Sequence, residues 1–283
     1  MNKIIKMNKQ VVVVIGAGGI GQAIARRQCF GKVLLLADFN TEALERTASG
    51  LRDAGYIVET QSVDIASRES VEALAVKAVS LGDVVQVVNA AGVSPNMASV
   101  ERILAVDLYG AALVLDVFEG VIAQGGAGLL VSSMAGHMLP PLSSQQDQDL
   151  AFTSVDELLG LPMLGAEFVP NSAAAYGLAK RANALRVRAA AVSWGAKGAR
   201  VNAISPGIIV TPLAQHELNS SVGDIYRKMV SSSPSGRMAP PDEVAAAAAY
   251  LLGSEANFVT GTDLLIDGGV VAAIFAGKIA LQM

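Results

Sequence analysis

The sequence predicts an α/β fold in a single domain over residues 1–283, built on a doubly wound parallel sheet of seven strands. Seven short runs, most of them rich in aliphatic residues, alternate with longer segments of helical periodicity, a pattern typical of parallel strands joined by crossover helices. A glycine-rich turn after the first run is a second indication, because it joins a strand directly to a helix. The length of 283 residues suits one large domain, and no repeat or linker indicates another.

The alternation places the individual elements. Strands are predicted at Gln10–Ile15, Lys32–Ala37, Ile57–Gln61, Val84–Asn89, Gly128–Ser132, Arg200–Ile204 and Asp263–Ile266. Helices are predicted at Ile20–Gln28, Thr41–Ala54, Ser70–Leu81, Val100–Ala123, Ala174–Trp194 and Asp242–Leu252. Thr41 and Asp242 are expected N-caps, and Asp242 with Glu243 places negative charge in a first helical turn.

Composition excludes several classes of function. The chain is 52% hydrophobic and only 16% charged, so it can bury a large core and further surface between subunits. A net charge of −4 without a basic run argues against a nucleic-acid partner. Cys29 is the only cysteine, and His137 and His216 are the only histidines, so neither an internal disulfide nor a cysteine- or histidine-rich metal site is expected.

The N-terminal residues have a faint likeness to a signal peptide, because Lys3, Lys6 and Lys9 precede the apolar run Val11–Ile15. That run has five residues and is followed by glycines, so it is too short for a signal-peptide core and fits a buried strand. No uninterrupted run of 18 apolar residues predicts a membrane span. We therefore expect a cytoplasmic protein without a membrane partner.

The first strand-to-helix turn is a candidate nucleotide site. Its sequence supplies Gly16, Gly18, Gly19, Ile20 and Gly21. Glycines permit a tight turn and let backbone amides approach a pyrophosphate at the helix N-terminus, which makes this a Rossmann-type fold. The same pattern also occurs in methyltransferases that bind S-adenosylmethionine.

An acidic residue ends the second strand. Asp38 lies 22 residues after Gly16, where a carboxylate can bind the adenosine ribose hydroxyls. Phe39 and Asn40 follow it, so no arginine is offered to a 2′-phosphate at this point. The arrangement favours NAD over NADP as the cofactor.

Tyr176 and Lys180 form the candidate proton-transfer pair. Their spacing of four puts both side chains on one helical face, one turn apart. A nearby ammonium favours the phenolate, and a tyrosine pKa lowered from about 10 would allow proton exchange near neutral pH.

Together these features resemble the short-chain dehydrogenase/reductase family over almost the full chain. The pair matches the family's Tyr-x-x-x-Lys motif, and Asp267-Gly268-Gly269 matches the family's ending after the last strand. Further matching segments are Asn89-Ala90-Ala91-Gly92, Val63-Asp64-Ile65, Val131-Ser132-Ser133-Met134-Ala135-Gly136 and Ser205-Pro206-Gly207-Ile208-Ile209-Val210-Thr211-Pro212.

The resemblance implies a role for each matched position. Tyr176 would be the general acid/base, Lys180 would lower its pKa and bind the ribose, and Ser133 would orient the substrate oxygen. Ser132 is the neighbour that could be confused with Ser133. Cofactor contacts are implied for Gly16, Gly18, Gly19, Ile20, Gly21, Asp38, Asp64, Ile65, Asn89, Ala90, Gly92, Tyr176, Lys180, Pro206, Gly207, Ile209 and Thr211. No metal is expected.

The chain departs from the family pattern in several places. The glycine turn is one residue shorter than usual, and the short stretch from Asn89 to Asp107 predicts a truncated fourth crossover helix. Asp107 stands where the family has an asparagine that helps to hold a water near the lysine. An ionised aspartate only accepts hydrogen bonds, so Asp107 could still hold a water or perturb Lys180. We count Asp107 among the catalytic residues.

Two segments are expected to shape access to the substrate. About 30 extra residues, the insertion 137–172, separate Ser133 from Tyr176; we expect them to cover either the mouth of the site or the helical face beside Tyr176, unless they are disordered. Residues 213–237 are expected to form the lid. Their apolar side chains favour a mainly apolar substrate, and the insertion suggests a hydroxysteroid or another bulky secondary alcohol.

The sequence therefore predicts an NAD-dependent oxidoreductase acting on a secondary alcohol or ketone. A non-catalytic nucleotide-sensing relative and a methyltransferase are the alternatives. A homodimer or homotetramer is expected, because the helices over Val100–Ala123 and Ala174–Trp194 commonly pair across a twofold axis in this family. The apolar tail Val270–Ala276 could bury a further contact.

Overall fold

The computed structural model describes residues 9–220 and 222–279; Lys3 and Lys6 lie outside these ranges, as do the side chains of Leu213 and His216. Its centre is a sheet of seven parallel strands in the order β3-β2-β1-β4-β5-β6-β7. The strands are β1 (Gln10–Ile15), β2 (Val33–Asp38), β3 (Ile57–Ser62), β4 (Asp83–Asn89), β5 (Ile122–Val131), β6 (Arg200–Pro206) and β7 (Asp263–Ile266). The predicted doubly wound Rossmann fold is confirmed.

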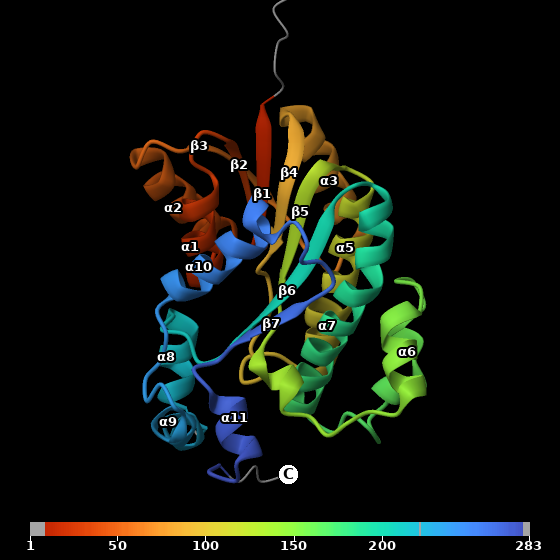
Figure 1. Ribbon diagram of the computed structural model, residues 1–283, viewed down its shortest axis with the longest axis vertical. Coiled ribbons are helices and arrows are strands. Elements are labelled where there is room, and N and C mark those ends of the chain that lie inside the picture. Colours follow the sequence, from red (N-terminus) through yellow and green to blue (C-terminus); the bar gives the residue numbers. More distant parts are fainter. Residues whose placement is uncertain (1–8, 221, 280–283) are drawn as a thin grey trace, which may run out of the picture.

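Helices cover both faces of the sheet (Figure 1). One layer contains α1 (Gly19–Gln28), α2 (Thr41–Asp53) and α10 (Pro241–Leu252), and the other contains α3 (Arg68–Leu81), α5 (Ala111–Glu119) and α7 (Ser172–Ala196). Alternate residues of each central strand enter opposite layers, so Val11 and Val13 pack with α3 while Val12 and Val14 pack with α1. Because the central strands carry apolar side chains on both faces, the protein has two hydrophobic cores, one on each side of the sheet.

The order of the strands fixes the position of the site. The chain reverses its winding between β1 and β4, where Ile15 pairs with Asn89. Ligands of open parallel sheets bind at such a reversal, beyond the carboxyl ends of the strands. The glycine turn after β1 and the Asn89–Gly92 loop after β4 consequently lie side by side.

Several boundaries differ from the prediction. The helix predicted at Val100–Ala123 ends at Glu119, because Ile122 already pairs with Val84 as part of β5. The fourth crossover helix is not truncated. It consists of α4 (Val100–Ile103), a π-helical segment η1 (Leu104–Gly110) and α5, which follow one another without a break.

Both predicted caps are also wrong. The side chain of Asn40, not Thr41, accepts the Ala43 N–H at 3.0 Å. Pro240 precedes α10, with Pro241 as its first residue. Asp242 and Glu243 nevertheless put negative charge in the first turn, as predicted.

The insertion folds into short helices on the outer flank of α7, where Figure 1 places α6 far from α8 and α9. It begins where η2 (Met134–His137) ends, and it contains α6 (Ser144–Phe152), η3 (Leu158–Gly160) and η4 (Pro162–Leu164). Leu150 and Leu158 are fully buried in a cluster with residues of α4, η1 and α7. The lid segment forms α8 (Pro212–Leu218) and α9 (Gly223–Ser232), and the chain continues through η5 (Ser254–Ala256) to α11 (Val270–Phe275).

No helix in the described part of the chain is both long and apolar enough to cross a membrane. Over those residues there is likewise no group of three or more His, Cys, Asp or Glu side chains arranged to hold a metal ion.

Candidate active site

The glycine turn has the shape that a phosphate group requires. Gly16 has φ +102°, and a Cβ there would lie 2.6 Å from the Ala90 carbonyl carbon. A Cβ on Gly21 would lie 1.9 Å from Gly16 O, so both positions exclude a side chain. Gly18 faces open space, and α1 begins without a side-chain cap or an acidic residue in its first turn. The first amides of α1 are thus available to an anion, and the turn fits a pyrophosphate.

The loop after β4 completes this side of the site. Asn89 is buried, and its Oδ1 accepts the Ala91 N–H at 3.2 Å, while its Nδ2 has no hydrogen-bond partner among the described residues. The Ala90 N–H donates to Ile15 O at 2.7 Å, which fixes the loop against β1. A Cβ on Gly92 would lie 2.6 Å from Asp107 Oδ1, so this glycine permits the loop to approach Asp107 and Lys180.

Asp38 braces the glycine turn from the end of β2. Its two carboxylate oxygens accept the Ala17 N–H at 2.7 Å and the Asn40 N–H at 2.8 Å. An ionised carboxylate accepts about four hydrogen bonds, so Asp38 keeps capacity for ribose hydroxyls.

The expected adenine side contains a residue that the sequence pattern missed. Arg102 lies 3.5 Å from Asp64 Oδ1 and stacks over the Phe39 ring at 5.5 Å from its centroid. Arg102 comes from α4, far from β2 in sequence, so inspection of the residues after Asp38 could not find it. The side chain of Ile65 is buried in the core, which leaves only its backbone for a ligand.

The segment after β6 closes another side of the site and reaches the glycine turn. The Gly207 N–H donates to Ile266 O at 3.0 Å, and a Cβ on Gly207 would lie 2.6 Å from Asp267 Cα, so Pro206 and Gly207 pack closely against the turn after β7. Thr211 lies against Gly19, 3.1 Å from the position of a Cβ there. Ile209 is buried in the core.

Tyr176, Lys180 and Ser133 are brought together as predicted. The Lys180 Nζ lies 5.2 Å from the centroid of the Tyr176 ring, and the Ser133 hydroxyl hydrogen-bonds the Tyr176 side chain. Ser132 has a different contact, since its buried hydroxyl donates to Lys180 O at 2.8 Å. Ser132 therefore ties β5 to α7, and Ser133 is the serine beside the tyrosine.

Asp107 is bound directly to the lysine. Its Oδ1 lies 2.9 Å from Lys180 Nζ, with the two side chains 0% and 5% exposed. The two groups form a buried ion pair. Oδ2 accepts the Val93 N–H at 3.2 Å. Asp107 lies within the π-helical segment, a distortion that often marks functional sites.

The expected lowering of the Tyr176 pKa is not found. Burial raises this pKa and outweighs the lowering by Lys180, while Asp107 raises it further and the Ser133 hydrogen bond lowers it. Burial alone would lower the Lys180 pKa, but Asp107 and Tyr176 raise it, and the net direction is upward. The error arose because Asp107 offsets the field of the ammonium and because the depth of the phenol cannot be read from spacing. Tyr176 is therefore protonated and Lys180 charged near neutral pH.

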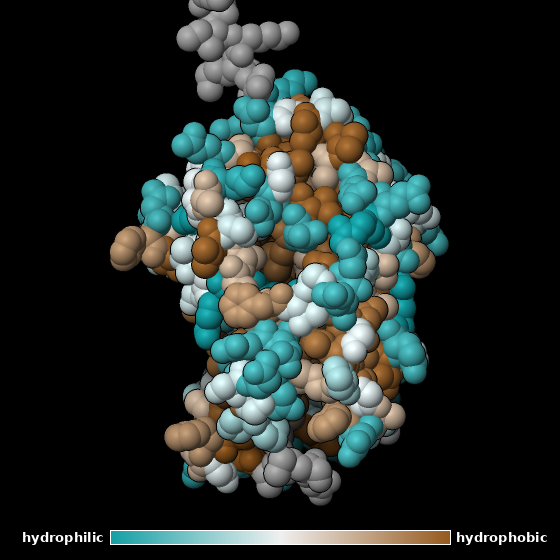
Figure 2. Space-filling view, turned by 90° about the vertical axis from the view of Figure 1, so that its right-hand side faces the viewer, coloured by the Kyte–Doolittle hydropathy of each residue, from teal (hydrophilic) through white to brown (hydrophobic). Residues whose placement is uncertain are grey.

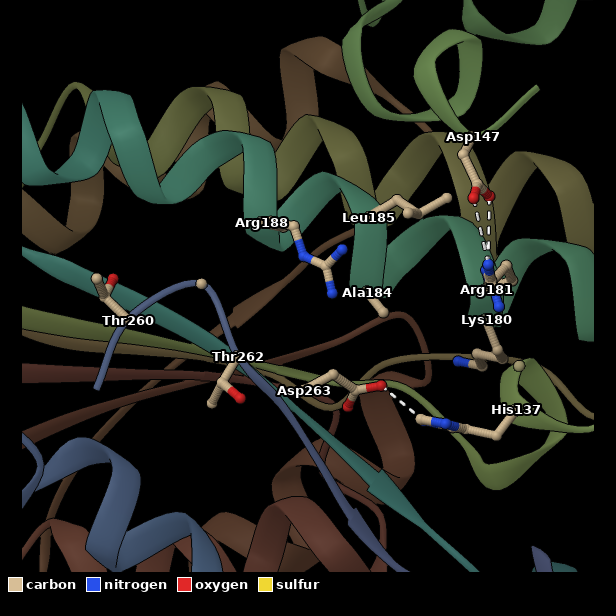
Figure 3. Close-up of a pocket in the computed structure, with 12 residues that line it drawn as sticks. His137, Asp147, Lys180, Arg181, Ala184, Leu185, Arg188, Thr260, Thr262 and Asp263 are labelled. Carbon is tan, nitrogen blue, oxygen red and sulfur yellow. Dashed lines mark hydrogen bonds and ion pairs between the residues drawn. The ribbon is translucent and has the colours of Figure 1, made fainter. Parts of the chain in front are cut away.

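A cavity of about 500 Å³ lies beside α7, but it is not the catalytic pocket. Arg188 of α7 and Thr262 both line it, Arg181 lies 3.3 Å from Asp147 Oδ2, and His137 Nε2 lies 2.8 Å from Asp263 Oδ2 (Figure 3). Lys180 contributes to its wall, whereas Ser133 and Tyr176 do not. The tyrosine and serine expected to carry out the chemistry therefore do not line this cavity.

Comparison with known proteins supports the resemblance. Residues 10–145 match the family model described as short chain dehydrogenase, and residues 151–271 match the one described as enoyl-(acyl carrier protein) reductase. A short-chain dehydrogenase/reductase named bsc3, from Alternaria brassicicola, is 43% identical over 94% of this chain and 97% of its own.

Two further relatives agree. The cis-4-hydroxycyclohexanecarboxylate dehydrogenase of Sinomonas cyclohexanicum is 32% identical over 93% of this chain and 97% of its own. A crystal structure of a variant of actinorhodin polyketide ketoreductase with NADPH superposes with a TM-score of 0.72 at 25% identity, over 93% of this chain and 97% of the other. The chain belongs to the short-chain dehydrogenase/reductase family.

Proposed function

We propose that this protein is an NAD(H)-dependent oxidoreductase that interconverts a secondary alcohol and a ketone. The observation that carries the proposal is the convergence of Tyr176, Ser133 and Lys180 beside an open glycine turn. The nicotinamide cofactor supplies or accepts the hydride. The glycine turn, Asp38, the Asn89–Gly92 loop and the Pro206–Thr211 segment are the groups that would hold it.

The side chains divide the proton chemistry between them. A neutral Tyr176 donates its phenolic proton to a ketone oxygen during reduction, and the Ser133 hydroxyl fixes the orientation of that oxygen. Lys180 stays positively charged because Asp107 lies 2.9 Å away, and it stabilises the phenolate that results. In alcohol oxidation the phenolate takes the proton back.

Turnover of a panel of secondary alcohols and ketones with NAD(H) tests this function. Ketone-dependent oxidation of NADH is the expected result. Tight NADH binding without turnover of any alcohol or ketone would favour the nucleotide-sensing alternative, and binding of S-adenosylmethionine in preference to NADH would favour a methyltransferase. A hydroxysteroid belongs in the panel as the bulky substrate that the insertion suggested.

The two directions of the reaction should respond differently to pH. Because the Tyr176 pKa is raised above its usual value near 10, the proton donor persists through neutral pH, and kcat/KM for ketone reduction should be flat there. For alcohol oxidation kcat/KM should keep rising into the alkaline range, since the base form accumulates only there. An oxidation profile that reaches its plateau near pH 7 would contradict this assignment.

We expect NAD to be preferred over NADP by at least about 10-fold in kcat/KM, or about 1.4 kcal/mol. The Asp38 carboxylate would repel a 2′-phosphate, by up to about 4 kcal/mol per charge pair at 4 Å and an effective dielectric of about 20. The substitution Asp38→Asn removes the charge but keeps an oxygen for the Ala17 and Asn40 amides, so it should narrow the preference. Equal efficiency of the unmodified enzyme with both cofactors would remove Asp38 from this role.

We further propose that the insertion covers the helical face beside Tyr176. Arg186 of α7 is buried and donates to Leu150 O at 3.2 Å and to Thr153 O at 3.1 Å. Burial lowers the pKa of this arginine to about 10. Viewed from this side in Figure 2, the flank carries hydrophobic residues among hydrophilic ones, and Phe152 and Phe168 of the insertion are 73% and 59% exposed.

Replacing residues 139–171 by a short Gly-Ser linker should change the subunit assembly. The truncated enzyme would expose the apolar face of α4, η1 and α7, and we expect its mass by light scattering to rise above that of the unmodified protein, itself expected to be a dimer or tetramer. NADH binding serves as the control for folding. An unchanged mass together with lost discrimination between bulky and small alcohols would instead assign the insertion to the mouth of the site.

A further inference from the structure

A polar cluster links the lid to the catalytic groups. Ser94, in the loop after β4, donates its hydroxyl proton to Glu217 Oε1 of α8 at 2.6 Å. Ser94 is itself only 4% exposed, and its oxygen also accepts the Asn96 N–H at 3.2 Å. The preceding residue, Val93, is the one whose amide binds Asp107. The loop that holds Glu217 is thus the same loop that contacts the Asp107–Lys180 pair.

Tyr226 of α9 joins this cluster from the other half of the lid. It packs in one hydrophobic cluster with Met134 and Met138, which flank the turn after Ser133. Burial raises the Tyr226 pKa, and Glu217 raises it further by its charge and by a hydrogen bond, so this phenol donates to the carboxylate. Tyr226 thus connects Glu217 to the side chains that follow Ser133 in the chain.

Glu217 also acts electrostatically on the catalytic tyrosine, whose pKa it raises. This carboxylate serves no purpose in the hydride or proton transfer described above. An ionised carboxylate offers about four acceptor positions and no donor. Ser94 and Tyr226 occupy two of them, which leaves acceptor capacity for a ligand.

We propose that Glu217 accepts a hydrogen bond from a second hydroxyl group of the substrate, so that the enzyme acts on diols or hydroxyketones in preference to simple alcohols. The proposal rests on the function proposed above and narrows its substrate class. A group that only accepts hydrogen bonds favours binding of a substrate with a donor at that position and disfavours one with a carboxylate or phosphate there. Sites that bind a substrate hydroxyl reject analogues lacking it far more strongly than apolar pockets reject a missing methylene.

The test compares each isomer of cyclohexanediol with its monomethyl ether, which keeps the second oxygen but lacks its proton. We expect the unmodified enzyme to prefer at least one diol by at least about 10-fold in kcat/KM. In Glu217→Leu that ratio should fall to within about threefold of one, while Glu217→Gln, whose amide oxygen still accepts, should retain part of it.

Ser94→Ala is the control that loosens the lid contact but keeps the acceptor. NADH binding checks that each variant folds, with Glu217→Ala as the substitute for an unstable leucine variant.

Three outcomes would overturn the proposal. The unmodified enzyme could show no preference for any diol, or Glu217→Leu could keep the full preference. Equal losses with diol and ether would show that Glu217 supports only the lid. Failure of the unmodified enzyme to turn over any alcohol or ketone with NAD(H) or NADP(H) is a separate result, and it would overturn the proposed function together with this inference.

Discussion

Tyr176→Phe should lower kcat/KM for ketone reduction by roughly 10²–10⁴-fold, the usual contribution of a general acid. Phenylalanine fills the same space in α7, so the packing around Ser133 and Lys180 persists. Only the transferable proton and the hydrogen bond to Ser133 are lost. Steady-state kinetics with NADH and a reactive ketone measure the effect, and fluorescence titration should show NADH affinity nearly unchanged.

Tyr250→Phe is the matched control, since Tyr250 is a half-exposed tyrosine on α10 outside the site. It should keep full activity. If Tyr176→Phe retained near-normal turnover, the phenol could not be the proton donor, and the mechanism would have to be abandoned. If NADH affinity fell as steeply as activity, the tyrosine would act mainly in cofactor binding.

The parts of the fold that the sequence predicted best are those governed by local pattern. β1 and β7 were predicted to the residue, because short aliphatic runs between turn residues leave few alternatives. The helix before β5 was predicted too long because the prediction continued past Gly120, the C-cap of α5, and because the pairing of Ile122 with β4 is a tertiary contact. Sequence separation likewise hid Arg102, whose neighbours Asp64 and Phe39 come from other crossovers.

The candidate site also combines features that local pattern predicts with features that depend on tertiary contacts. Spacing in α7 placed Tyr176 and Lys180 on one face, but it could not show how far the phenol is removed from solvent, and that desolvation sets the direction of its pKa. Asp107 was singled out only through the family resemblance. Its ion pair depends on the π-helical segment around it, for which residues 104–110 give no recognisable signal. Ser94 and Glu217 meet across 123 residues, so only the folded lid reveals them.

The buried Asp107–Lys180 pair should produce the largest stability effects in the protein. Removing one member of a buried ion pair leaves the other charge uncompensated and costs roughly 3–5 kcal/mol. We therefore expect both Asp107→Asn and Lys180→Met to lower the free energy of unfolding by about that amount at pH 7, measured by urea denaturation. Asparagine is suitable because its side-chain oxygen can still accept the Val93 N–H.

The double variant Asp107→Asn/Lys180→Met carries no charge at this position. Because replacing a whole buried pair by neutral groups is often close to neutral for stability, the double variant should be more stable than either single variant. It should nevertheless remain inactive, since Tyr176 loses the ammonium that stabilises its phenolate. Strictly additive losses would mean that the two charges do not interact, contrary to their 2.9 Å separation and deep burial. Recovery of stability without recovery of turnover would separate the two roles of Lys180, one in holding α7 against η1 and the other in proton transfer.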